Sequence, residues 1–113
     1  MSKHLQKQDG TSFALDEHGH LKDASEWTRA VAASFAANDG IKLTAVHWTV
    51  LEILRDYFQE FEIEPPMRVL VKEMTARGAN DFANSLELYR LFPEGPVRQG
   101  SKFAGLPLPL SCI

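Results

Sequence analysis

The chain has 113 residues, a length that fits one domain with a single hydrophobic core. Its composition, 44% hydrophobic and 24% charged, is typical of a globular protein, and no apolar run is long enough to cross a bilayer. The formal net charge of -3 argues against direct binding to nucleic acid, because phosphate neutralisation needs a basic surface.

The N-terminal part of the chain predicts a short β-hairpin. We expect residues 1–10 to be disordered, since they are polar almost throughout. Phe13–Leu15 and Leu21 then flank Asp16–His20, a polar segment in which Gly19 can take a positive φ. Two short apolar segments around such a turn are typical of a hairpin.

A first helix is expected from residue 24 to residue 38. Asp23 and Glu26 have the spacing of a capping box at its start, and Gly40 supplies a stop signal at its end. Apolar or small residues recur at helical spacing. These are Trp27, Ala30, Val31, Ser34 and Phe35.

A second helix is expected from a Thr44 cap to about residue 62. Its apolar stripe is too broad for a surface helix, which predicts that this helix is the central element of the core. The stripe consists of Val46, Val50, Ile53, Leu54, Tyr57, Phe58 and Phe61.

Two further helices complete the predicted bundle. Pro66 suits the first turn of a helix over 67–76, and Asn80 or Asp81 is expected to cap a helix over 82–91. The inward positions are expected to be Met67, Leu70, Val71, Met74, Phe82, Leu86, Tyr89 and Phe92. The predicted fold is mostly α (α+β), a small orthogonal helical bundle behind the hairpin, in a single domain over 1–113.

Residues 93–113 are expected to form a flexible C-terminal arm. Proline and glycine are concentrated in Pro93–Pro96 and Gly105–Pro109, and both residue types disfavour a helix interior. The 20 residues from Phe92 to Cys112 (112 − 92) would give this arm a maximum reach of about 65 Å.

Cys112, the only cysteine, is the penultimate residue. A lone thiol cannot form an internal disulfide, and without a secretory signal it predicts a reducing, cytoplasmic setting. We therefore expect Cys112 to be a reactive group presented to another protein. The carboxylate of Ile113 opposes ionisation of the thiol, so thiolate stabilisation or docking is assigned to the nearest cations, Arg98 and Lys102.

The other candidate sites are weaker. His18 and His20 share a turn without a third ligand nearby, so we expect no metal site, and no cofactor motif is present. His47 and Trp48 are expected to be a packed structural pair. Short helices joined by tight turns also leave a DNA-binding helix-turn-helix open, although the acidic charge disfavours it.

At this point the residues resemble a known family, over about residues 10–113. The C-terminal signature of the DsrC/TusE family of sulfur-trafficking proteins is similar to Leu88-Tyr-Arg-Leu-Phe-Pro-Glu-Gly-Pro96, Lys102-Phe-Ala-Gly-Leu-Pro107, Pro109 and Cys112-Ile113. The helical core of that family is similar to Leu43-Thr-Ala-Val-His-Trp48, Leu54-Arg-Asp-Tyr-Phe58, Pro66, Arg68, Leu70 and Lys72.

The resemblance implies a sulfur carrier that holds sulfane sulfur as a persulfide on Cys112. In TusE-like members the sulfur comes from the TusBCD complex and passes to the thiouridylase MnmA, which makes 2-thiouridine at the tRNA wobble position. Such a protein contacts tRNA only through partners, does not contact a membrane, and is a sulfurtransferase-like carrier rather than a stand-alone enzyme.

Two positions depart from the family pattern. Two-cysteine DsrC members carry a second cysteine where this chain has Ser101, so an intramolecular disulfide cannot form here and the single-cysteine relay is favoured. Leu108 replaces a lysine that the family usually carries between the two prolines. The alternative implied by the resemblance is a DsrC-like binding protein of a dissimilatory sulfite reductase or sulfur-oxidation complex.

Overall fold

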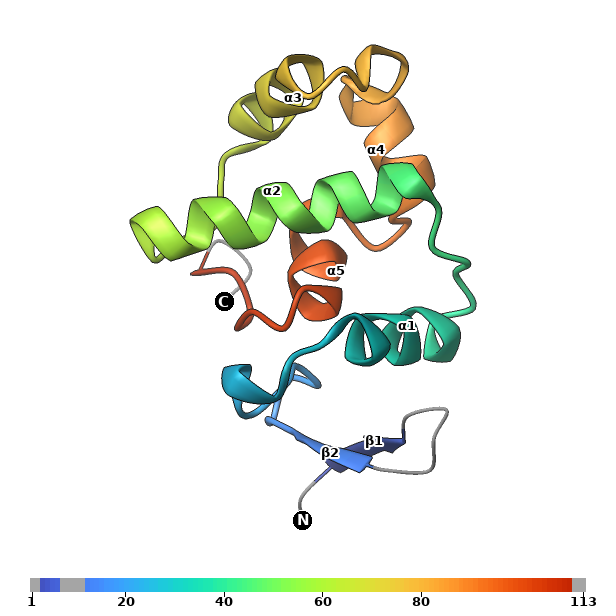
Figure 1. Ribbon diagram of the computed structural model, residues 1–113, viewed down its shortest axis with the longest axis vertical. Helices are drawn as coiled ribbons and strands as arrows, with labels where there is room; N and C mark the ends of the chain where they lie inside the picture. The colour runs from blue at the N-terminus through green and yellow to red at the C-terminus, as the bar shows by residue number, and fades with distance from the viewer. Residues whose placement is uncertain (1–2, 7–11, 111–113) are drawn as a thin grey trace.

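The computed structural model describes residues 3–6 and 12–110 of the chain. The predicted mostly helical fold is confirmed. In chain order the elements are β1 (Lys3–Gln6), β2 (Ser12–Leu15), the 3₁₀ turn η1 (Ala24–Glu26), α1 (Arg29–Asn38), α2 (Ala45–Phe61), α3 (Met67–Ala76), the 3₁₀ turn η2 (Asn80–Phe82), α4 (Ser85–Leu91) and α5 (Pro96–Phe103). In Figure 1, α5 lies between α1 and α2, the hairpin lies beyond α1, and α3 and α4 lie beyond α2.

The hairpin begins earlier than the sequence predicts. β1 pairs antiparallel with β2, so the expectation of disorder over 1–10 is wrong for residues 3–6. The predicted turn over 16–20 does form, because Asp16 N–H donates to the His20 carbonyl at 2.7 Å and Leu15 bridges to Leu21. Strand pairing is a contact between distant residues, which local composition does not report.

Two predicted helix starts need correction. α1 begins at Arg29, where the Thr28 hydroxyl accepts the Val31 N–H at 3.2 Å, while residues 24–26 form only η1. α4 begins at Ser85 behind an Asn84 cap, and residues 80–82 form η2. In both places a side chain that can accept an N–H lies a few residues beyond the expected cap and starts the helix instead.

His47 and Trp48 form the expected structural pair. His47 Nδ1 accepts the Thr44 N–H at 3.1 Å, and Nε2 lies 2.9 Å from the Leu91 carbonyl. Because a carbonyl only accepts, Nε2 carries the proton and the ring is neutral. The Arg29 guanidinium lies 3.9 Å from the centroid of Trp48. The pair therefore fastens the start of α2 to the end of α4 and to α1.

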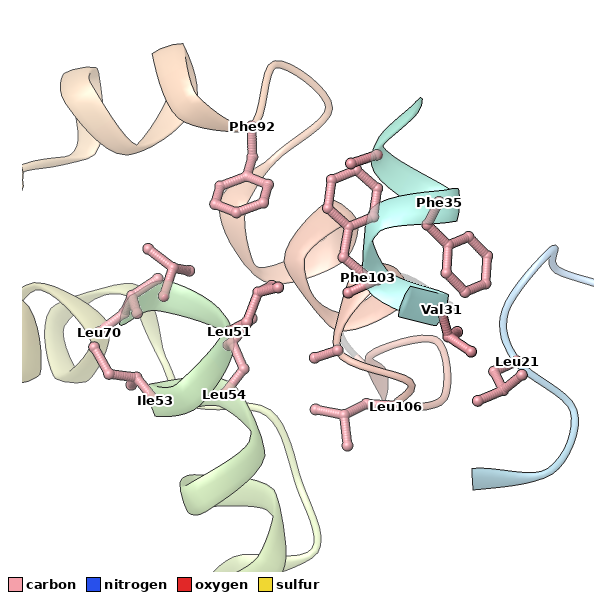
Figure 2. Packing of buried hydrophobic residues seen from close by; sticks show 14 of the residues in the cluster. Leu21, Val31, Phe35, Leu51, Ile53, Leu54, Leu70, Phe92, Phe103 and Leu106 are labelled. Carbon is pink, nitrogen blue, oxygen red and sulfur yellow. The ribbon is translucent and has the colours of Figure 1, made fainter. Parts of the chain in front are cut away.

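The core is a single cluster with α5 at its centre. Figure 2 shows Phe103 between Phe35 of α1 and Phe92, with Leu51 and Leu54 of α2 on the same side as Phe92. A Cβ on Gly100 would lie 2.6 Å from Leu54 Cδ1, so α5 packs directly on α2 at that glycine. The largest fully buried side chains are Phe92, Phe103, Leu51, Ile53, Leu54, Leu70, Met74, Leu88, Val31, Val50, Pro65 and Pro96.

Three large side chains that were expected to face inward are exposed. Phe61 lies in the last turn of α2 and is 53% exposed. Leu86 and Tyr89 of α4 are 62% and 51% exposed, and the buried residue of that helix is Leu88. α4 has only seven residues and buries only a narrow face. The neighbouring elements therefore cover Leu88 but leave the other large side chains of this helix in contact with solvent.

The expected arm is wrong over most of its length. Pro96–Phe103 is helical as α5, and both Phe103 and Leu106 are buried. Pro96 occupies the first helical turn, where a missing N–H costs nothing, and Gly100 allows close packing. Proline and glycine, the two residue types that argued against a helix, thus start this helix and allow it to pack on α2.

No helix in the described part of the chain is both long and apolar enough to cross a membrane.

Candidate functional site

Cys112 lies outside the described residues, so the structure bears on the predicted site through the segment that leads to it. The two predicted cations occupy different environments on α5. Arg98 is exposed, whereas the Lys102 ammonium lies 2.6 Å from the Asp39 carboxylate at the end of α1. The positive charge of Lys102 is therefore matched within the fold. Its assignment to the thiolate, like that of Arg98, stays a prediction.

Asp39 fastens α5 to α1 through more than one bond. Its carboxylate also accepts a hydrogen bond from Gln99 Nε2 at 3.0 Å, and Gln99 Oε1 accepts the Glu94 N–H at 3.1 Å. Gln99 is only 2% exposed. This network satisfies both the oxygen and the nitrogen of the buried Gln99 amide, as buried polar groups require.

Three side chains hold the backbone at the end of α5 and just beyond it. Trp27 Nε1–H donates to the Phe103 carbonyl at 2.8 Å, and Arg55 Nη1–H donates to the Ala104 carbonyl at 2.7 Å. His20 Nδ1 lies 2.8 Å from the Leu106 carbonyl and therefore carries a proton. We call the three side chains His20, Trp27 and Arg55 the clasp. They come from three separate segments of the chain. They fix the point at which residues 107–113, which we call the tail, leave the helical bundle.

The clasp is internally supported. The Arg55 guanidinium lies 3.8 Å from the centroid of the Trp27 ring, a stacking that orients both donors. Gly105 has a φ of +74°, and a Cβ there would lie 2.3 Å from Trp27 Cδ1. Only glycine fits between the clasp and the turning backbone.

Sequence reasoning did not predict the clasp. Its hydrogen bonds join residues up to 86 positions apart, and neither helical periodicity nor capping reports such contacts. One signal was present, since Arg55 follows Leu54 within the broad apolar stripe of α2. A guanidinium beside buried positions needs hydrogen-bond acceptors, and the Ala104 carbonyl after α5 provides one.

The clasp shortens the reach that we expected for the thiol. The backbone is fixed up to Leu106, and six residues (112 − 106) lead from there to Cys112. Their maximum span is about 20 Å, compared with about 65 Å for an arm that starts after Phe92. Chain length therefore limits Cys112 to about 20 Å from the point where His20 holds the Leu106 carbonyl.

A pocket of about 290 Å³ lies beside the tail, under the C-terminal end of α2. The Leu110 N–H donates to Glu64 at 3.3 Å, which ties the tail to the segment after α2. The apolar residues that line the pocket include Phe58, Ile63 and Leu106, and Ser101 also contributes to its wall. In Figure 1 the red tail segment lies below the yellow-green end of α2.

Stability is expected to fall as the pH is lowered from about 7.5 to about 5. Burial lowers the pKa of His20 and of His47 from the ordinary value of 6.5. Below that value the unfolded chain binds more protons than the folded chain, so the stabilisation is present above it and is lost as the pH falls through the folded-state pKa. Urea unfolding at several pH values measures the slope.

The matched variant for this pH dependence is His20→Asn. Its amide can still donate to the Leu106 carbonyl but does not titrate. We expect it to flatten the slope while the contribution of His47 remains. A slope equal to that of the wild type would contradict the role assigned to His20.

No group of three or more His, Cys, Asp or Glu side chains within residues 3–6 and 12–110 is arranged to hold a metal ion. His20 instead serves the clasp, and His18 lies at the wall of the pocket.

Comparisons with known proteins cover almost the whole chain. The family model described as DsrC-like protein matches residues 7–113. A protein of Salmonella paratyphi A named sulfurtransferase TusE is 44% identical over 105 residues, which are 93% of this chain and 96% of that protein. The protein of the same name from Escherichia coli K12 is 43% identical over the same shares.

Solved structures of DsrC proteins also match this chain over nearly its whole length. The NMR structure of Allochromatium vinosum DsrC matches with a TM-score of 0.83 and 40% identity, and all of both chains is covered. The crystal structure of the oxidised gamma-subunit of the dissimilatory sulfite reductase (DsrC) from Archaeoglobus fulgidus matches with a TM-score of 0.86 and 37% identity. It covers 98% of this chain and 100% of that one.

Proposed function

This chain belongs to the DsrC-like protein family, and from that premise we propose that it is a sulfur carrier that takes sulfane sulfur on Cys112 as a persulfide and passes it to a partner protein. The observation that carries the proposal is the 44% identity, over 93% of the chain, to proteins named sulfurtransferase TusE. The matched family segment runs to residue 113 and so includes the penultimate cysteine.

The transfer is a thiol–persulfide exchange without net oxidation. The Cys112 thiolate attacks the outer sulfur of a donor persulfide, a bond forms between these two sulfurs, and the S–S bond of the donor breaks. The donor leaves as a thiolate and takes up the proton that the Cys112 thiol has lost. Passing the sulfur on repeats the same step with Cys112 as the donor, so no cofactor is needed.

A relay role implies partner proteins on both sides of the transfer. We propose a TusBCD-like complex as the donor and an MnmA-like tRNA thiouridylase as the acceptor, which would direct the sulfur to 2-thiouridine at the tRNA wobble position. The net charge of -3 supports a contact with tRNA that is only indirect.

The second candidate is a binding protein of a sulfite reductase, which the match to the Archaeoglobus fulgidus gamma-subunit favours. Ser101 argues against it, because the second cysteine of the two-cysteine members is missing. With a single cysteine the chain can still exchange sulfur as a persulfide, but it cannot form an intramolecular disulfide. We therefore place the relay first.

Intact mass measurement tests the relay. The purified chain is incubated with a cysteine desulfurase, cysteine and the TusBCD-like donor proteins. We expect a gain of one sulfur atom that dithiothreitol reverses, since a reductant cleaves a persulfide. Peptide mapping is expected to place the added sulfur on the C-terminal peptide.

Omission of the donor proteins is the control for this experiment. Cys112 alone is a weak nucleophile, because a free thiol with a pKa of about 8.5 is mostly protonated at neutral pH. Loading is therefore expected to slow markedly without the donor. A chain that gains no sulfur with every component present is not a carrier.

A further inference from the structure

Large apolar side chains are exposed where the end of α2 meets the tail. Phe61 is 53% exposed, Ile63 is 39% exposed, and Leu110 of the tail is 64% exposed. Ile63 and Leu110 both line the 290 Å³ pocket, and Phe61 precedes the pocket residue Glu62. We call Phe61, Glu62, Ile63 and Leu110 the tail face.

The pocket within this face is acidic. Among the described residues that line it, Asp16, Glu62 and Glu64 are carboxylates and none is lysine or arginine. Asp16 accepts two backbone N–H groups in its own turn, and Glu64 accepts the Leu110 N–H, so both charges are held in place. The field at this surface attracts a cationic partner.

Glu62 occupies an unusual backbone position at the end of α2. Its φ of 57° is left-handed, a conformation that usually falls to glycine at the end of a helix. A residue with a Cβ is less stable than glycine in this conformation, because its Cβ crowds the following carbonyl oxygen. Glycine would end the helix more favourably, but it would not bring a carboxylate to the pocket wall.

The length of the remaining chain decides what covers this face. Two residues lead from Leu110 to Cys112, which corresponds to about 7 Å at most. A protein that exchanges sulfur with Cys112 must therefore bring its own reacting sulfur close to Leu110. Such an approach brings its surface onto the tail face.

We propose that the tail face is the docking surface for the protein that exchanges sulfur with Cys112, and that this partner presents an apolar side chain flanked by lysine or arginine. The proposal rests on the proposed function. The apolar side chain enters the pocket beside Ile63, and the cations face Glu62. Nucleic acid is repelled by the same carboxylates, which selects a protein partner.

Paired double variants test the surface. Glu62→Lys with Ile63→Ser alters the tail face, and Asp81→Lys with Leu86→Ser makes the same changes of charge and apolarity at η2 and α4. Transfer is measured from the desulfurase-charged TusBCD-like complex, and direct loading is measured with sodium polysulfide. Thermal unfolding of both variants checks that they fold.

We expect the tail-face variant to lose about tenfold in kcat/KM with the protein donor, mainly through KM. Its loading by polysulfide should equal that of the wild type, and the Asp81/Leu86 variant should behave as the wild type with both donors. Added salt should slow the wild type and have less effect on the tail-face variant, since screening weakens opposite charges.

The outcomes separate the two proposals. A tail-face variant that receives sulfur from the complex at the wild-type rate overturns the docking surface alone. So does a wild-type dimer in analytical ultracentrifugation that Ile63→Ser dissociates, because a second copy then covers the face. A wild type that polysulfide loads but the charged complex does not overturns both proposals.

Discussion

Cys112→Ser is expected to reduce sulfur transfer to the rate measured without the carrier. The chain has no other cysteine, and a serine hydroxyl cannot form a persulfide or ionise near neutral pH. The assay follows radiolabelled sulfur from cysteine, through the desulfurase and the donor complex, to the thiouridylase and its tRNA. A complete relay without Cys112 would contradict the carrier proposal.

Ser111→Ala is the matched control, because it changes the neighbouring hydroxyl and leaves the thiol. We expect it to support transfer at a rate close to that of the wild type. The function of the Cys112→Ser variant once it is bound to the donor complex distinguishes a carrier from a module that only docks. The variant should bind, because the tail face is intact, and should accept no sulfur. A binding module would keep its full function in the same variant.

Helical periodicity predicted the parts of the fold that depend on local sequence. α2 and α3 begin and end within one residue of their expected bounds, since Thr44 and Pro66 mark their starts clearly. The role proposed for Cys112 rests on the family resemblance, because its position alone could not assign one. Local sequence therefore predicted the architecture, whereas the assignment of Cys112 as the reactive group stays a prediction.

What the sequence did not predict depends on contacts between distant segments. Pro96 and Gly100 indicated an arm because their cost in a helix is local, whereas packing of α5 against Leu54 repays that cost through a contact 46 positions away (100 − 54). The donors of the clasp likewise satisfy carbonyl groups far along the chain. The free segment that leads to Cys112 is consequently shorter and more firmly anchored than its proline and glycine content indicates.

Gly105→Ala is expected to destabilise the fold by about 2–4 kcal/mol. Alanine is unfavourable at the φ of +74°, and its Cβ would lie 2.3 Å from Trp27 Cδ1. The indole cannot retreat freely, because it donates to the Phe103 carbonyl and stacks under Arg55. The clasp must therefore open or the tail must shift. Urea unfolding followed by tryptophan fluorescence measures the loss, which corresponds to a fall in Tm on the order of 10 °C.

Gly40→Ala separates backbone strain from the clash with the clasp. Gly40 has the same φ of +74°, and a Cβ there would meet nothing within 4 Å. It is expected to cost only the backbone share, about 1–2 kcal/mol. The difference between the two variants then measures how firmly Trp27 is held against Gly105. Equal losses would mean that the clasp yields at no cost, and the tail would not be anchored at Leu106 as the short reach of Cys112 requires.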